Sequence, residues 1–226
     1  MIQVTRTDKP EILRKKEAVW KSDLNTALSE FQENNSPNNR KKLDTAFNKY
    51  NHKQVKESLR RMFSGKCAYC ESHISHIGFG HIEHYQPKSK FTDLCFDWDN
   101  LLLGCEICNG KGYKGDKFPT TDEGGPFVNA VKENPDDFFD FEYDPNTGTA
   151  NVIPKNRRAI TTEKELGLNR PELIIHRSSI VRKMVFAALK AKEGDRGGIE
   201  EIKRCCGKED EYSAFAKSLV KRFNLT

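Results

Sequence analysis

Four cysteines form two pairs with the spacing of metal-binding knuckles. Cys67 and Cys70 make one Cys-x-x-Cys pair, and Cys105 and Cys108 make a second pair after 34 intervening residues. A Cys-x-x-Cys turn directs two thiolates at one ion, and two such turns complete a tetrahedral site. Four thiolates leave zinc no open coordination position, so the ion would stabilise the fold without taking part in catalysis. We therefore expect structural Zn²⁺ at these cysteines.

Other interpretations of the cysteines fit the sequence less well. A disulfide framework is typical of secreted chains, and the first residues contain no apolar secretory-signal segment. A redox Cys-x-x-Cys explains one pair but not two. His73 and His76 follow the first pair and are alternative ligands, although four cysteines already complete a zinc site. For Cys95, Cys205 and Cys206 we expect small buried apolar side chains or surface thiols.

A second group of polar residues lies between and just after the cysteine pairs. Glu83 stands beside His84, Asn100 precedes three leucines, and Asn109 directly follows the second pair. Hydrolysis of a phosphodiester needs a metal ion that neutralises the phosphate and the leaving oxygen. It also needs a neutral imidazole that takes a proton from water, and a partner that fixes its tautomer. This set therefore suits a metal-dependent phosphodiester hydrolase.

In this order of residues, segment 67–119 resembles the HNH (His-Me finger) endonucleases. Their ββα-metal motif reads Asp-His-x-x-Pro-x-Ser, then Asn-Leu, then Cys-x-x-Cys-Asn/His-x-x-Lys. The resemblance implies His84 as the general base and Asn100 as the residue that orients the imidazole or its loop. It also implies that Glu83 and Asn109 hold a catalytic Mg²⁺ or Mn²⁺. Glu83 departs from the family, which usually has Asp, and its carboxylate reaches one methylene further.

Three more polar residues near this motif have two interpretations each. Lys111 and Lys114 follow the second cysteine pair and are candidate phosphate contacts, or they are lysines that only face solvent. His81 lies three residues before His84, so in a strand the two would face opposite sides. It is a substrate contact or an ordinary strand residue. For the whole set, the alternative is a zinc ribbon with an incidental Glu-His pair.

Beyond the motif, the chain resembles the HNH nucleases of Septu anti-phage systems and of some retron systems. The matching segments are CAYCE, IEHYQPKS, DWDNLLLGCEICN, KGDKFP and Thr-Thr-x-x-x-Leu-Gly-Leu-Asn at 161–169. The resemblance implies a defence effector that hydrolyses nucleic acid, with DNA favoured, and a PtuA-type ATPase as its partner. The sequence contains no Walker A motif, so any ATP dependence must come from that partner.

Two other functions stay open at this point. One is cleavage of tRNA or other RNA in a retron-type system, with a reverse transcriptase and its msDNA as partners. DNA and RNA share the phosphate that is attacked, and no reader of the RNA 2′-hydroxyl is evident in the sequence. The other is a zinc-stabilised adaptor that binds nucleic acid without catalysis.

The elements that must position these residues follow from the hydrophobic periodicity. Helical spacing predicts helices at 10–33, 43–62 and 212–223, and a long helix that begins at Pro171 and is broken by Gly194, Gly197 and Gly198. Alternation around a Pro-Asn-Thr-Gly turn predicts a β-hairpin of 138–143 with 149–153. Thr161 or Thr162 with Glu165 resembles a capping box. We expect a mostly helical α+β fold, divided into 1–64 (helical hairpin), 65–119 (HNH core) and 120–226 (hairpin and helices).

The composition and charge distribution limit the possible partners. The 226 residues have a mean hydropathy of −0.76, and no apolar run approaches the ~20 residues of a membrane span. We therefore expect no membrane partner and a cytoplasmic protein. The net charge of +5 combines +7 on 1–66, −2 on 67–115, −7 on 116–144 and +7 on 145–226. The basic flanks either solvate helices or guide nucleic acid, and the acidic stretch would form a partner interface or shield the site.

Overall fold

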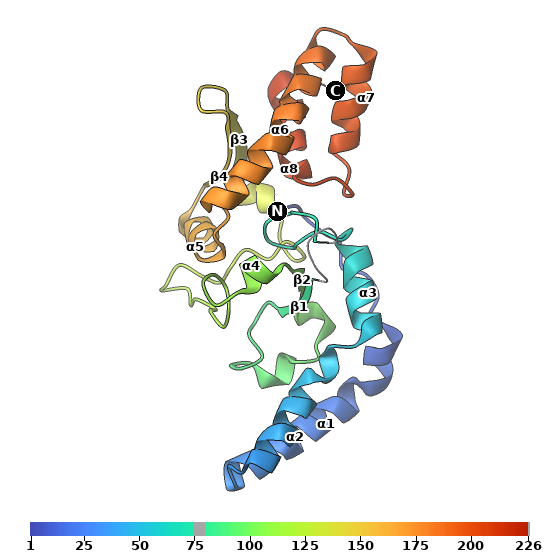
Figure 1. The fold of residues 1–226 in the computed structure, drawn as a ribbon, viewed down its shortest axis with the longest axis vertical. Helices are drawn as coiled ribbons and strands as arrows, with labels where there is room; N and C mark the ends of the chain where they lie inside the picture. Colours follow the sequence, from blue (N-terminus) through green and yellow to red (C-terminus); the bar gives the residue numbers. More distant parts are fainter. Residues whose placement is uncertain (75–79, 226) are drawn as a thin grey trace.

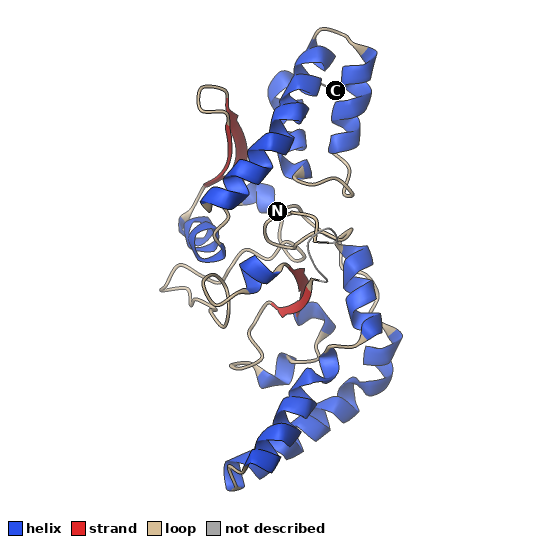
Figure 2. Cartoon of the chain, in the orientation of Figure 1, coloured by secondary structure: helices blue, strands red, loops and turns tan. Residues whose placement is uncertain are grey.

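The computed structural model describes residues 1–74 and 80–225. The helices and strands are α1 (Glu11–Glu33), α2 (Pro37–Phe47), η1 (Asn48–Tyr50), α3 (Lys53–Met62), β1 (His81–His84), η2 (Thr92–Leu94), η3 (Trp98–Asn100), β2 (Leu101–Gly104), α4 (Glu106–Asn109), η4 (Pro135–Asp137), β3 (Phe139–Asp144), β4 (Thr149–Pro154), α5 (Arg157–Leu166), α6 (Pro171–Lys192), α7 (Arg196–Cys205) and α8 (Ser213–Phe223). The two sheets are separate and have two strands each (Figure 2). The predicted α+β class is confirmed.

The protein is extended along one axis (Figure 1). The antiparallel helices α1 and α2 lie at one end, β1, β2 and α4 lie in the middle, and α6, α7 and α8 lie at the other end with the β3–β4 hairpin beside them. Buried apolar side chains nevertheless form one cluster that includes residues from both ends and from the middle. No helix in the described part of the chain has the length and apolarity needed to cross a bilayer.

The N-terminal helices differ from the prediction at one point. The helix expected over 43–62 is interrupted, because α2 ends at Phe47, a 3-10 turn follows, and the chain is extended at His52. The His52 side chain accepts a hydrogen bond from the Gln54 amide and caps α3. The apolar periodicity continues through this break, and a local side-chain cap decides where the second helix begins. The break places Tyr50 against the central sheet.

The central unit consists of β1, β2 and the short helix α4. The strands pair antiparallel, with His81 opposite Gly104 and His84 opposite Leu101. All four residues of β2 are buried, which agrees with its unbroken run of leucines. The Cys105 sulfur accepts a hydrogen bond from the Cys108 amide at the start of α4. The strand order therefore brings the second cysteine pair to the end of the sheet that begins with His81.

The C-terminal part confirms the β-hairpin and the long helix from Pro171 and corrects two details. Helix α5 begins at Arg157 under an Asn156 cap, so Thr161 and Thr162 lie inside the helix. Thr162 instead accepts a hydrogen bond from the Val128 amide and donates one to the Arg158 carbonyl. Of the three glycines, Gly194 lies between α6 and α7 at a φ of +84°, whereas Gly197 and Gly198 belong to α7.

Gly198 has a packing role instead. A Cβ at this position would lie 2.6 Å from the Cβ of Lys190 and 2.8 Å from the Ala187 carbonyl oxygen. A side chain is therefore excluded where α7 crosses α6. Tertiary contact between helices selects this glycine, and the sequence alone does not distinguish it from a helix breaker.

Candidate active site and metal centre

The four cysteines of the two knuckles converge, as their spacing predicts. Their sulfur atoms all lie within 4.8 Å of one another, and all four residues are buried. The Cys70 and Cys105 sulfurs are 3.9 Å apart. A tetrahedral site with Zn–S bonds of 2.3 Å has sulfurs about 3.8 Å apart. The cluster can therefore hold a metal ion such as zinc, and none of the four forms a disulfide.

Hydrogen-bond donors surround this cluster and suit thiolates. The Cys105 amide donates to the Cys67 sulfur at 3.4 Å, and the Arg170 guanidinium donates to the Cys108 sulfur at 3.5 Å. Burial lowers the pKa of Arg170, but the charges of Cys108 and Cys70 outweigh it and raise that pKa overall. Arg170 therefore stays cationic and offsets part of the negative charge of four thiolates. Nothing in the sequence pattern pointed to this residue, which lies 62 positions from its sulfur partner.

Of the two predicted alternative zinc ligands, His73 lies in the described part of the chain. The cluster found among the described residues contains only cysteines, and His73 is not part of it. The His73 amide donates a hydrogen bond to Glu211. His76 lies outside the described residues. Cys95 and Cys205 are buried and Cys206 is half-buried, and no disulfide joins them.

His84 is held in one tautomer by the backbone. Its Nε2 lies 2.8 Å from the carbonyl oxygen of Cys95. A carbonyl only accepts, so Nε2 carries the proton and Nδ1 keeps a free lone pair. Burial lowers the pKa of His84 to about 4, the Cys95 carbonyl acts in the opposite direction, and the charges of Lys88 and Lys114 lower it further. The imidazole is therefore neutral at neutral pH, as a general base must be.

Asn100 braces the loop that supplies this carbonyl. Its Oδ1 accepts from the Gln86 amide at 2.8 Å. Its Nδ2 donates to the carbonyls of Gln86 at 2.9 Å and Leu94 at 3.2 Å. These three bonds join the two ends of the loop between His84 and Cys95. The structure thus shows Asn100 bonded to the loop, and its role in orienting the imidazole stays a prediction.

Glu83 is buried and paired with Lys114. The Lys114 Nζ lies 2.5 Å from the Glu83 carboxylate and donates to the His84 carbonyl at 2.8 Å. Burial raises the pKa of Glu83, and the Lys114 ammonium offsets this in part. Lys114 is completely buried and points inward, so this conformation does not present it to a phosphate. Lys111 is exposed just after α4 and stays a predicted phosphate contact.

Asn109 ends α4 beside the same strand. A Cβ on Gly104 would lie 3.1 Å from the Glu83 Cβ and 3.7 Å from the Asn109 Cβ, so Gly104 lets the two side chains approach each other. A carboxylate and an amide oxygen are donor types that Mg²⁺ and Mn²⁺ accept. Glu83, His84, Asn100 and Asn109 are thus gathered around β1, β2 and α4, although the first and the last lie 26 positions apart in the sequence.

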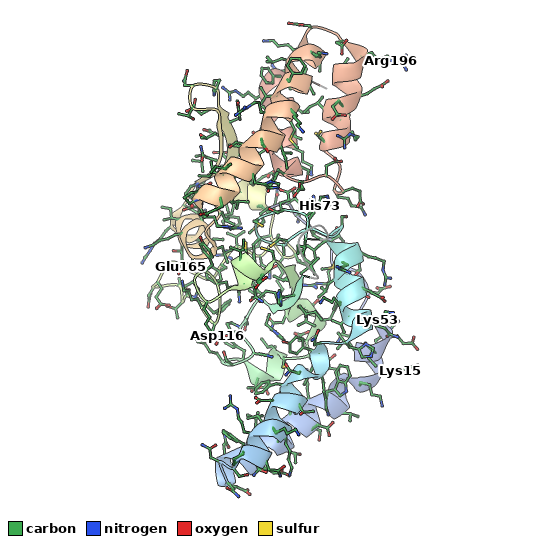
Figure 3. The ribbon with its side chains drawn as sticks, viewed as in Figure 1. Lys15, Lys53, His73, Asp116, Glu165 and Arg196 are labelled. Atoms are coloured by element: carbon green, nitrogen blue, oxygen red, sulfur yellow. The ribbon has the colours of Figure 1, made fainter. Side chains whose placement is uncertain are left out.

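The Lys114 pair yields a stability prediction. Replacing Lys114 by methionine would leave the Glu83 carboxylate buried without its cation, and we expect the free energy of unfolding to fall by about 3–5 kcal/mol. Urea denaturation measures this change. Lys117→Met is the matched control, because its ion pair with Glu165 on α5 (labelled in Figure 3) is partly exposed. That change should cost at most about 1 kcal/mol, and equal losses in the two variants would contradict the assignment.

Comparison with known proteins gives two relatives, and no family model matches the chain. The chain is 25% identical over 174 residues to the Septu protein PtuB of Bacillus mycoides (strain KBAB4), which covers 66% of this chain and 58% of that protein. It is 38% identical over 58 residues to the Septu protein PtuB of Bacillus thuringiensis, covering 25% of this chain and 23% of that one. The chain is PtuB-like in sequence. It matches less than two thirds of the length of either relative.

Proposed function

We propose that this protein is a metal-dependent endonuclease of the HNH type, which hydrolyses phosphodiester bonds in nucleic acid. The observation that carries the proposal is the hydrogen bond from His84 Nε2 to the Cys95 carbonyl. It leaves Nδ1 as the proton acceptor of a buried, neutral imidazole. Such an imidazole has the protonation state and the fixed tautomer that activation of water requires.

The other residues have supporting roles in this proposal. Asn100 holds the loop of the Cys95 carbonyl and so positions His84. Glu83 and Asn109 would hold Mg²⁺ or Mn²⁺, which supplies charge neutralisation at the phosphate. The four cysteines hold structural Zn²⁺, with Arg170 balancing its thiolates. Lys114 offsets part of the burial that raises the pKa of Glu83, and it donates to the backbone carbonyl of His84.

We further propose that the chain is a component of a Septu anti-phage system. Both relatives carry the name Septu protein PtuB, and the longer match covers 66% of this chain. The likeness to PtuB implies a PtuA-type ATPase as the partner. Any ATP dependence would come from that partner, because this sequence contains no Walker A motif.

The test is a cleavage assay on the full chain, alone and copurified with the product of the neighbouring ATPase gene. Labelled plasmid, single-stranded DNA and total tRNA are offered side by side with Mg²⁺ or Mn²⁺. We expect cuts in DNA that stop with EDTA and return with added Mg²⁺ or Mn²⁺. Cuts confined to tRNA would favour the RNA-cleaving alternative. Binding without cuts in any substrate would overturn the enzyme proposal in favour of the adaptor.

A further inference from the structure

A polar cleft lies beside β1, close to His84. It has a volume of about 450 Å³ and is lined by Tyr50, Asn51, Lys56, His81, Ile82 and Glu106. Helix α3 supplies the lysine, the 3-10 turn before it supplies the tyrosine, and β1 supplies the histidine three residues before His84. The cleft therefore runs along the strand that carries the proposed base.

Lys56 is the basic residue that lines this cleft, Arg60 lies four residues later on the same helix, and Lys88 lies against Tyr50. Among the residues that the structure describes, Lys56, Arg60 and Lys88 make no ion pair within 4.0 Å. Several other basic side chains of α1–α3 are paired with acids: Arg40 with Asp44, Lys42 with Glu30, Lys49 with Asp23, and Lys53 with Glu57. Burial and the neighbouring Arg60 lower the pKa of Lys56, which shows that one cation stands close to another. Unpaired cations of this kind attract a polyanion.

Tyr50 connects the cleft to the base. Its ring meets the His84 imidazole edge-on, with centroids 4.5 Å apart and an angle of 84° between the planes. Its hydroxyl accepts a hydrogen bond from Lys88 Nζ at 3.0 Å. Lys88 also lies close enough to His84 for its charge to act on the imidazole. Tyr50 thus lines the cleft together with Lys56 and also contacts His84 and Lys88.

We propose that this cleft binds the backbone of a nucleic-acid strand and guides it across Tyr50 to His84. Lys56 and Arg60, one helical turn apart on α3, contact phosphates that flank the bond to be cut, and Lys88 contacts the strand next to His84. Glu106 is the one acidic residue that lines the cleft, and the basic residue of the lining, Lys56, belongs to α3. The inference rests on the proposed nuclease function and assigns its substrate-binding surface.

The test compares two single-charge variants of the same helix. Lys56→Gln removes an unpaired cation of the cleft. Lys53→Gln removes a paired cation three residues earlier, near the start of α3 (Figure 3), whose side chain is 85% exposed. Both are made in the full chain with His84→Ala, so that the probe stays intact. Fluorescence anisotropy measures the affinity for a short labelled single-stranded DNA over a series of salt concentrations.

We expect Lys56→Gln to weaken binding about fourfold and to reduce the salt slope by about 0.7, the value for one lost phosphate contact on a single strand. Adding Arg60→Gln should roughly double the loss of slope. Lys53→Gln should change neither quantity by a comparable amount. Equal effects of Lys56→Gln and Lys53→Gln, or no binding by the parent, would overturn the assignment. Unchanged circular dichroism melting verifies that α3 is intact.

Cleavage by the chain with His84 intact separates the two proposals. If the parent chain cuts and the Lys56→Gln variant cuts with an unchanged KM, the assignment of the cleft as the substrate-binding surface is wrong and the nuclease proposal stands. If the chain binds DNA through Lys56 but cuts nothing, the assignment of the binding surface stands and the nuclease proposal is wrong.

Discussion

Replacing His84 by alanine is expected to slow phosphodiester cleavage by about 10²- to 10⁴-fold, the range that a positioned general base contributes. The imidazole holds its proton on Nε2 and accepts at Nδ1, and alanine removes both functions. Single-turnover cleavage with labelled DNA measures the loss. The zinc content should be unchanged, because His84 lies outside the four-cysteine cluster.

His176→Ala is the matched control for this prediction. His176 is a half-exposed residue on α6 that pairs with Glu211, so its loss removes a histidine without touching the β1 site. Cleavage by this variant should equal that of the parent chain. If His84→Ala cleaves as fast as His176→Ala, His84 is not the base.

The same histidine determines the expected pH profile. The buried imidazole has a pKa of about 4, well below its ordinary value, so the neutral form that accepts a proton predominates above that pH. The rate constant for cleavage should therefore be nearly flat around neutral pH and fall as the pH is lowered through about 4. A fall centred near the ordinary histidine pKa of about 6.5 would show that the imidazole is solvated in the active protein.

The second large effect is expected at the zinc cluster. Cys70→Ala removes one of four buried sulfurs, and we expect the variant to lose its zinc and much of the folded structure around β1, β2 and α4. Structural zinc in small domains contributes a binding free energy of about 10–16 kcal/mol, which acts as folding free energy. Elemental analysis of the purified chain and its thermal melting curve measure the two losses. DNA cleavage should be lost with them, because the knuckles frame the sheet of His84.

Cys206→Ser is the control for the zinc prediction. Cys206 directly follows α7, is half-buried, and lies outside the cluster. The zinc content and the melting temperature of the Cys206→Ser variant should match those of the parent chain. Full zinc occupancy in Cys70→Ala would mean that another residue replaces the sulfur or that the ion binds elsewhere.

Much of the architecture follows from local patterns. The helix after Pro10, the long helix from Pro171 and the β3–β4 hairpin lie where periodicity and turn residues predict them, because one amphipathic face or one turn decides each. Two of the errors arise where two local signals compete. His52 caps a new helix inside a continuous apolar pattern, and Asn156 precedes a threonine pair that imitates a cap.

For the candidate site, some residues could be predicted from the sequence and others could not. The spacing of the cysteines, and the order of Glu83, His84, Asn100 and Asn109, could be recognised because chemistry constrains residue type and order along the chain. The ion pair of Lys114 with Glu83 could not be predicted from the sequence, because a lysine just after the second cysteine pair suits a phosphate contact equally well. Only the fold turns it inward onto Glu83 and the His84 carbonyl. The role predicted for the acidic stretch 116–144 stays a prediction.

The sequence by itself determined the residue types of a four-sulfur cluster that can hold a metal ion and of the proposed hydrolytic site, because ligand chemistry and backbone spacing are local properties. Only the tertiary structure decided which partners those residues meet. Arg170 reaches the Cys108 sulfur and Tyr50 reaches the His84 ring across long stretches of chain. The Cys95 carbonyl selects the proton-accepting nitrogen. These contacts depend on burial and on the packing of distant segments, which no local pattern records.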